Sequence, residues 1–268
     1  MVTRAEVDAY SEVIDGLSAV AFAQVKALLA SLDNPNPITF RDALIRTYPE
    51  LMRPFMSAAS DVAAEWYTTL RLNAGVRGAF RPLIAPTPVD DQFDAIVRYS
   101  LTPLFSTSSS STVLNLLAGA TQKLIANQGR NTISGSAFSD SVRVGFARIP
   151  RAGCCAFCGM LASRGAVYSS AAAAGGVSGR GVDASATAGK RGGQGQGVKA
   201  RGSRALGSSD YHSNCRCVGA PVFVGDTLAK ETRLKYTAMY DEAFEVNERG
   251  AISTRDTLAN WRKVHGTK

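Results

Sequence analysis

The chain of 268 residues lacks several features that define common protein classes. It has no run of about 18 apolar residues, and its first residues do not follow the basic-then-apolar order of a signal peptide. It also has no Walker phosphate-binding sequence and no His-x-Glu pair of the kind that zinc deaminases use. From these absences we expect no membrane span, no secretion by a signal peptide, no nucleotide binding through a Walker sequence, and no zinc deaminase activity.

Cysteine is scarce and confined to two short segments. Its five copies are Cys154, Cys155, Cys158, Cys215 and Cys217. An odd number without a signal peptide argues against a disulfide framework, and the clustering near a histidine favours metal binding. Thiol or disulfide redox chemistry and unliganded core cysteines are the two alternatives.

The spacing within both segments suits a tetrahedral metal ion. Cys155-Ala-Phe-Cys158 is a C-x-x-C turn whose two thiolates can face one ion, and His212-Ser-Asn-Cys215-Arg-Cys217 offers three further ligands. These five candidates compete for about four positions, and we interpret Cys154 as a bystander. The favoured set is Cys155, Cys158, Cys215 and Cys217, with His212 as an alternative to Cys215. Four protein ligands leave no position for water, so we predict a structural zinc site and a protein that is not an enzyme.

Positive charge is concentrated in the middle of the chain. Residues 1–100 contain nine basic and twelve acidic side chains, whereas residues 101–174 and 175–207 each contain six basic and one acidic. Such a basic region can meet phosphate or an acidic protein, although a solvated loop has the same composition. The stretch 175–207 is rich in Gly, Ala and Ser, and we expect a flexible loop, or one that becomes ordered only in an assembly.

Apolar residues at helical spacing predict most of the secondary structure. A first helix begins with the capping box of Thr3 and Glu6 and ends before the prolines of residues 33–37. A second helix begins at Thr39 and is interrupted or restarted at Pro49 and Pro54. Further helices are expected over 90–104, 113–127, 228–247 and 254–264, a short helix or turn over 131–145, and a strand over 218–224.

Together these elements predict a mainly α fold with a small β element, α+β overall. We expect a helical N-terminal region over residues 1–147 and a C-terminal domain over residues 148–268. In the second region the zinc site pins the core, and residues 175–207 form the long Gly-rich loop.

Several segments along the chain form a recognisable signature. Besides the Cys and His segments, they are Arg148-Ile-Pro150, Met160-Leu-Ala-Ser-Arg-Gly-Ala-Val-Tyr168, Pro221-Val-Phe223, the helical pieces Ala63-Ala-Glu-Trp-Tyr67 and Thr121-Gln-Lys-Leu124, and the ending from Trp261 to Lys268. These segments resemble the Mu F-like minor head proteins of actinobacterial phages. Five residues occupy that family's signature positions, namely Cys155, Cys158, His212, Cys215 and Cys217.

The resemblance implies a minor capsid protein in few copies at the portal vertex or in the capsid interior, present in the host cytoplasm during assembly. The implied partners are the phage portal protein, the major capsid protein or both. A non-specific contact of the basic loop with packaged DNA is a further expectation. The alternative is a zinc-dependent nucleic-acid-binding protein, or an assembly factor outside the virion; the first would need a base-reading helix, which we do not find in the sequence.

Overall fold

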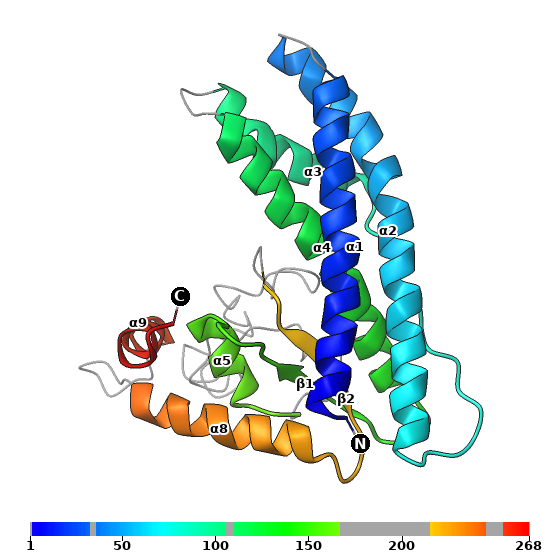
Figure 1. Ribbon diagram of the computed structural model, residues 1–268, viewed down its shortest axis with the longest axis vertical. Coiled ribbons are helices and arrows are strands. Elements are labelled where there is room, and N and C mark those ends of the chain that lie inside the picture. Colours follow the sequence, from blue (N-terminus) through cyan, green and yellow to red (C-terminus); the bar gives the residue numbers. More distant parts are fainter. Residues whose placement is uncertain (1, 33–35, 106–109, 167–214, 245–253, 268) are drawn as a thin grey trace, which may run out of the picture.

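The computed structural model describes residues 2–32, 36–105, 110–166, 215–244 and 254–267. Its largest part is a bundle of α1 (Arg4–Ser31), α2 (Pro37–Asn73), α3 (Asp90–Leu101) with the short 3-10 helix η1 (Thr102–Phe105), and α4 (Ser110–Ser139). The remaining elements are β1 (Gly145–Ile149), α5 (Ala156–Ala162), β2 (Val218–Val222), α8 (Thr227–Ala243) and α9 (Thr254–His265). Figure 1 shows the bundle projecting away from α5, α8 and α9. The predicted mainly helical fold with a small β element is confirmed.

Helix α1 begins at the predicted capping box. The Glu6 amide donates to Thr3 Oγ1 over 3.2 Å, and the Thr3 amide donates to Glu6 Oε2 over 2.8 Å. One face is buried against α2, α4 and β2, through Val7, Tyr10, Ile14, Ala21 and Val25. The helix is also long and apolar enough to cross a membrane by length and composition, a test that core helices of soluble proteins pass as well. The expected absence of a membrane span stays a prediction.

Helix α2 corrects the prediction of a break at the prolines. It is continuous over Pro37–Asn73, it is capped by Asn36 where Thr39 was expected, and it contains Pro49 and Pro54. Each interior proline costs roughly 3 kcal/mol, whereas each large apolar side chain that is fully buried contributes about 1.5–3 kcal/mol. The inner face of α2 buries enough of these to outweigh both prolines: Leu44, Tyr48, Met52, Met56, Tyr67 and Leu70.

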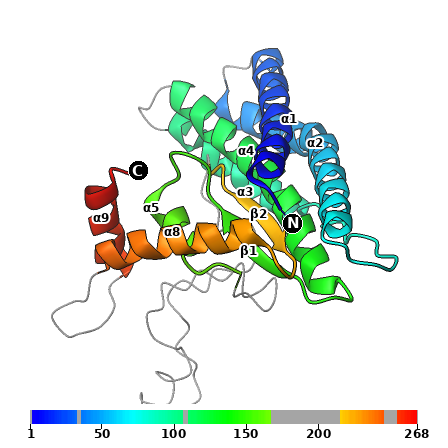
Figure 2. The same ribbon diagram turned by 60° about the horizontal axis from the view of Figure 1, so that its bottom comes forward.

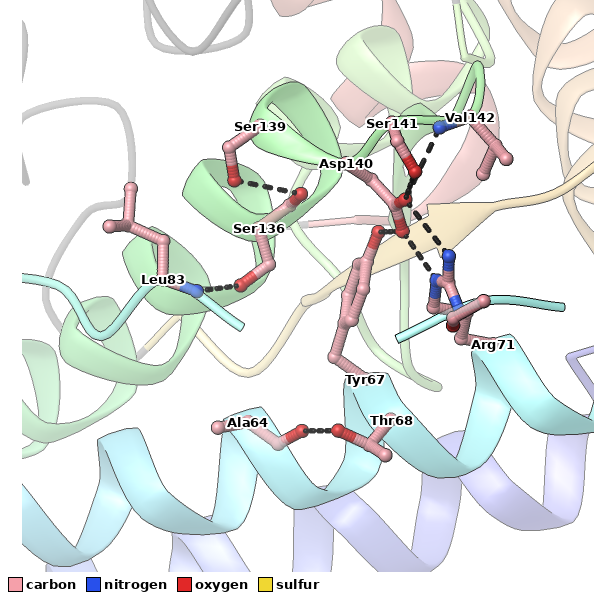
Figure 3. Close-up of polar contacts among 11 residues, drawn as sticks. Ala64, Tyr67, Thr68, Arg71, Leu83, Ser136, Ser139, Asp140, Ser141 and Val142 are labelled. Atoms are coloured by element: carbon pink, nitrogen blue, oxygen red, sulfur yellow. Dashed lines mark hydrogen bonds and ion pairs between the residues drawn. The ribbon is translucent and has the colours of Figure 1, made fainter. Parts of the chain in front are cut away.

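Helix α4 is also longer than expected, because it joins the helix predicted over 113–127 to the turn region predicted over 131–145. Its buried face mixes apolar side chains with the buried polar residues Thr121, Gln128, Thr132 and Ser136, so apolar periodicity revealed the first half and not the second. These side chains have partners in the fold. Ser136 Oγ accepts a hydrogen bond from the amide of Leu83 over 2.9 Å (Figure 3), and Thr132 Oγ1 accepts one from the amide of Ala85 over 3.1 Å. These bonds hold the loop between α2 and α3 against α4.

A buried ion pair fixes the lower end of the bundle. Arg71 of α2 contacts Asp140, which follows α4, over 2.8 Å, and the two side chains are 5 % and 0 % exposed. The Tyr67 hydroxyl donates to the same carboxylate over 2.9 Å, and the Val142 amide donates over 3.2 Å (Figure 3). Burial opposes ionisation, yet hydrogen bonds from Arg71 and Tyr67 hold the pKa of Asp140 below its usual value. The network sets the direction in which the chain leaves α4 toward β1.

The two strands pair antiparallel, with Gly145 opposite Val222 and Ile149 opposite Val218. The strand predicted over 218–224 is thus confirmed as β2, whereas β1 was not predicted, since its five residues show no alternation of buried and exposed positions. The predicted boundary between residues 147 and 148 falls inside β1, and the domain division itself stays a prediction. Figure 2 shows α5, α8 and α9 grouped beside the strands.

Candidate metal centre

The first cysteine segment forms the start of α5, a helix that the sequence did not predict. Cys155 is the N-cap residue, in extended conformation, and its sulfur accepts a hydrogen bond from the Cys158 amide over 3.5 Å. Cys158 lies in the first turn and its side chain is buried. The C-x-x-C spacing therefore brings both sulfur atoms to the same end of α5.

The second segment leads into β2 and meets the first. The Cys158 and Cys215 Sγ atoms are 3.4 Å apart, and the Sγ atoms of Cys158, Cys215 and Cys217 all lie within 4.8 Å of one another. In a tetrahedral site with zinc–sulfur bonds of about 2.3 Å, neighbouring sulfur atoms are roughly 3.8 Å apart. The exposed fractions of the three residues are 1 %, 2 % and 3 %. These three cysteines are close enough to hold one metal ion.

Helix α4 holds the backbone of the second segment. Arg130 donates from Nη2 to the carbonyl oxygens of Cys215 and Cys217, over 2.8 Å in each case, and from Nε to the carbonyl of Cys217 over 3.1 Å. Gln122, two turns earlier, donates to the carbonyl of Cys215 over 3.0 Å. A C-x-C pair on a regular strand would send its side chains to opposite faces. These contacts hold residues 215–217 just outside β2, where the backbone is not a regular strand and both thiols converge.

Positive charge accompanies the thiols. Arg148 of β1 is buried, and its Nη1 lies 3.8 Å from the Cys158 sulfur. Hydrogen bonds to the sulfur atoms of Cys155, Cys215 and Cys217 raise the pKa of the Cys158 thiol. Hydrogen bonds with Cys158 and Cys217, and then the charge of Arg130, lower the pKa of Cys215. The protein environment thus favours at least one thiolate in the cluster.

Cys154 packs against the same three thiols as Cys155 does, and its sulfur also has a partner outside them. The interpretation of Cys154 as a bystander stays a prediction. The Cys154 sulfur lies 3.4 Å from the Tyr236 hydroxyl of α8, and burial raises the pKa of its thiol. It lines a groove of about 980 Å³ between the start of α1, the 150–154 turn and α8. This groove is separate from the three converging thiols and has a mixed lining of acidic and basic side chains.

Of the five predicted ligands, the fold brings Cys158, Cys215 and Cys217 together and packs Cys155 against them. His212 lies outside the described residues, as does the loop of residues 175–207. The spacing of the predicted ligands did not reveal the supporting residues Arg130, Arg148 and Gln122. Gln122 and Arg148 lie in two segments of the family resemblance, 121–124 and 148–150, and this was the signal in the sequence that could have identified them.

Comparison with known proteins agrees with a viral origin. A model of the VG15 protein family matches residues 1–243, which include the whole helical bundle, both strands and every cysteine. No curated protein and no solved structure matches the chain. Because the match spans most of the chain, this protein belongs to the VG15 family of viral proteins.

Proposed function

We propose that the protein is a structural minor capsid protein of a tailed phage, similar to the Mu F-like minor head proteins. The observation that carries the proposal is the match to a viral family over residues 1–243. The segments around Arg148, Cys155 and Cys215 add the likeness to minor head proteins. The proposed place is the portal vertex or the interior of the head, with a stage in the host cytoplasm during assembly.

The shape of the bundle supports docking to a larger assembly. Several large apolar side chains are exposed on it, namely Val13, Val20, Ile38, Tyr99 and Phe105. They come from α1, α2, α3 and η1, which belong to the projecting bundle in Figure 1. Exposed apolar side chains that form one continuous patch mark protein–protein contacts. We propose that the exposed side chains of the bundle meet the portal protein, the major capsid protein or both.

The cysteine cluster supports a structural role for its metal, which we propose to be zinc. Three buried thiols that converge on one point are the ligand type that structural zinc sites use. Together with a fourth protein ligand they would complete the coordination shell, and no position would remain for a reacting water molecule. The bound ion would hold α5 to the start of β2. On this ground we propose that the protein is not an enzyme.

Contact with packaged DNA is a further part of the proposal, and it depends on sequence alone. The basic stretch 175–207 contains six basic side chains and one acidic side chain and lies outside the described residues. Binding through phosphates weakens steeply as salt rises. A titration of DNA binding between low and physiological salt would therefore show a strong decrease, and binding that ignores salt would contradict this contact.

Quantitative mass spectrometry of purified phage particles tests the main proposal. Particles are treated with nuclease and protease, and the copies of this chain are counted against the portal protein. A few to a few dozen protected copies per particle would support an internal minor capsid protein. Absence from particles, with abundance in infected cells, would favour an assembly factor or a zinc-dependent nucleic-acid-binding protein.

A further inference from the structure

Two buried arginines flank the cysteine cluster from different elements. Arg130 of α4 and Arg148 of β1 are 5 % and 3 % exposed. Arg148 places its guanidinium beside the Cys158 sulfur, and Arg130 grips the carbonyls on both sides of Arg216. Arg130 also donates to Asn127 Oδ1 over 2.9 Å, which orients its guanidinium on α4. A guanidinium keeps its charge under all physiological conditions, so two fixed positive charges lie at this site.

The number of ligand thiolates decides whether these charges are balanced. A divalent ion with four thiolates carries a net charge of −2, which two arginines compensate in full. The same ion with three thiolates and a neutral imidazole carries −1, which would leave one surplus positive charge in a buried site. Because an uncompensated buried charge is costly, two buried arginines favour the four-thiolate set.

Cys155 is positioned to supply the fourth thiolate. It caps α5, its sulfur accepts the amide hydrogen of Cys158, and it packs against the cluster of Cys158, Cys215 and Cys217, as Cys154 also does. The Cys154 sulfur, however, contacts the Tyr236 hydroxyl over 3.4 Å, and only Cys155 has the C-x-x-C spacing with Cys158. Two cysteines of a C-x-x-C turn commonly share one ion. The Cys155 sulfur is not within 4.8 Å of all three converging sulfur atoms, so metal binding would require it to move toward them.

We propose that the centre binds its ion through Cys155, Cys158, Cys215 and Cys217, and that Arg130 and Arg148 select this set by balancing its charge. The inference rests on the proposed zinc site and goes further, since it excludes His212 from the ligands and gives two arginines a role. Arg130 and Arg148 are positioning residues: Arg148 acts beside a ligand sulfur, and Arg130 acts through the backbone of two ligands.

Cobalt substitution of the full chain tests the ligand set. The wild-type protein, Cys155→Ser and His212→Ala are loaded with Co²⁺, and the sulfur-to-cobalt charge-transfer absorption is recorded together with zinc affinity by chelator competition. We expect His212→Ala to match the wild type, and Cys155→Ser to lose charge-transfer intensity and zinc affinity. The reverse result, with loss in His212→Ala and none in Cys155→Ser, would overturn the proposal and leave a zinc site intact. Wild-type protein that binds neither ion would overturn the zinc site itself.

Charge variants test the role of the arginines. Loss of a group that supports metal ligands costs roughly 10–100-fold in affinity, and we expect this for Arg148→Gln and Arg130→Gln. Arg148→Lys keeps the charge and is expected to recover most of the affinity, which a purely steric role would not explain. Arg151→Gln is the matched control, since Arg151 is nearby, basic and paired with Asp15 over 2.7 Å. Equal zinc affinity in Arg148→Gln, Arg130→Gln and Arg151→Gln, with all three folded by circular dichroism, would overturn the charge-balance argument.

Discussion

The helical bundle and the region around α5, α8 and α9 are built on cores of different size. The bundle and strands share one large cluster that fully buries aromatic and long aliphatic side chains, among them Tyr48, Met52, Tyr67 and Phe93. The cluster of α5, α8 and α9 contains Ala156, Met160, Ala162, Tyr236, Ala243 and Trp261, half of them alanines. Small cores bury too little apolar surface to be stable alone and are commonly supported by a metal or a disulfide. From this difference we propose that the bundle can fold without an ion, whereas the second region depends on an ion in the cysteine cluster.

Removing one metal ligand should give the largest difference in stability between the two regions. We expect Cys158→Ser to lose its zinc and to expose α5 and its neighbours to local unfolding, because metal-binding free energy contributes directly to folding in such sites. Zinc content by mass spectrometry and hydrogen exchange by region measure both effects. Amides of α2 and α4 should stay protected, and those of α5 and α8 should lose protection.

Cys154→Ser is the matched control for this experiment, since Cys154 lies in the same segment and faces Tyr236. It should keep its zinc. Metal-free Cys158→Ser that melts like the wild type would mean that the second region needs no ion, and the contrast between the regions would fail.

The ion pair of Arg71 and Asp140 tests the bundle in turn. Removal of one partner of a buried pair costs about 3–5 kcal/mol, so Arg71→Ala should lower the free energy of unfolding by that amount. Chemical denaturation measures the change. Arg98→Ala removes the exposed pair with Asp94 and should cost about 0.3–0.5 kcal/mol. An equal decrease in the free energy of unfolding for the two variants would show that the buried pair stabilises the bundle no more than an exposed pair does.

Acid should weaken the same contact. The pKa of Asp140 is lowered below the usual 3.8, so the carboxylate stabilises the fold fully above about pH 3.8. That contribution is lost as the pH falls through the lower pKa of the folded state. Unfolding measured from pH 6 down to pH 2 should show this loss in the wild type, and Asp140→Asn should lack this component of the pH dependence.

A smaller effect is expected where glycines permit close approach. A Cβ at Gly159 would lie 2.5 Å from Trp261 Cζ2, and a Cβ at Gly129 would lie 2.4 Å from Tyr10 Oη. Overpacking of this kind costs about 1–3 kcal/mol. We expect Gly159→Ala to loosen α9 and Gly129→Ala to loosen the contact of α1 with α4, each measured by hydrogen exchange of those helices. Loss of protection in the same helices for both variants would mean that the two regions unfold as one unit.

The smallest expected effect is a gain. Gly16 lies in the middle of α1, and a Cβ there would meet nothing within 4 Å. An alanine in a helix interior is more stable than glycine by roughly 0.5–1 kcal/mol, so Gly16→Ala should raise the melting temperature slightly. A decrease would show that this part of α1 has a close neighbour, as a self-associated state would provide.

Sequence patterns predicted the helices whose buried face is apolar, which are α1, α3, α8 and α9. They divided α2, because two prolines are locally unfavourable and only the packed core compensates for them. They divided α4, because its buried face carries Gln128, Thr132 and Ser136, whose partners lie far away in the chain. The shortest elements, β1 and α5, were missed because five or seven residues show too little periodicity.

The cysteine pairs of the candidate site were predictable, because C-x-x-C and C-x-C are local spacings. The residues around them were not. Arg130 is separated from Cys215 by 85 positions, and no spacing rule connects them. Likewise, burial of Arg148 follows from the pairing of β1 with β2, which the sequence did not reveal. The cysteine ligands could therefore be predicted from the sequence, whereas the two arginines that supply positive charge beside them were found only in the fold.

Helix α4 extends about 45 Å, given its 30 residues and a rise of 1.5 Å per residue. It begins at the projecting end of the bundle and passes Arg130, which contacts the carbonyls of Cys215 and Cys217, before it ends at Ser139. A continuous helix behaves as a stiff rod, so its two ends cannot rotate independently. If a partner binds the projecting end, as proposed above, it would therefore also fix the direction in which the cysteine cluster faces.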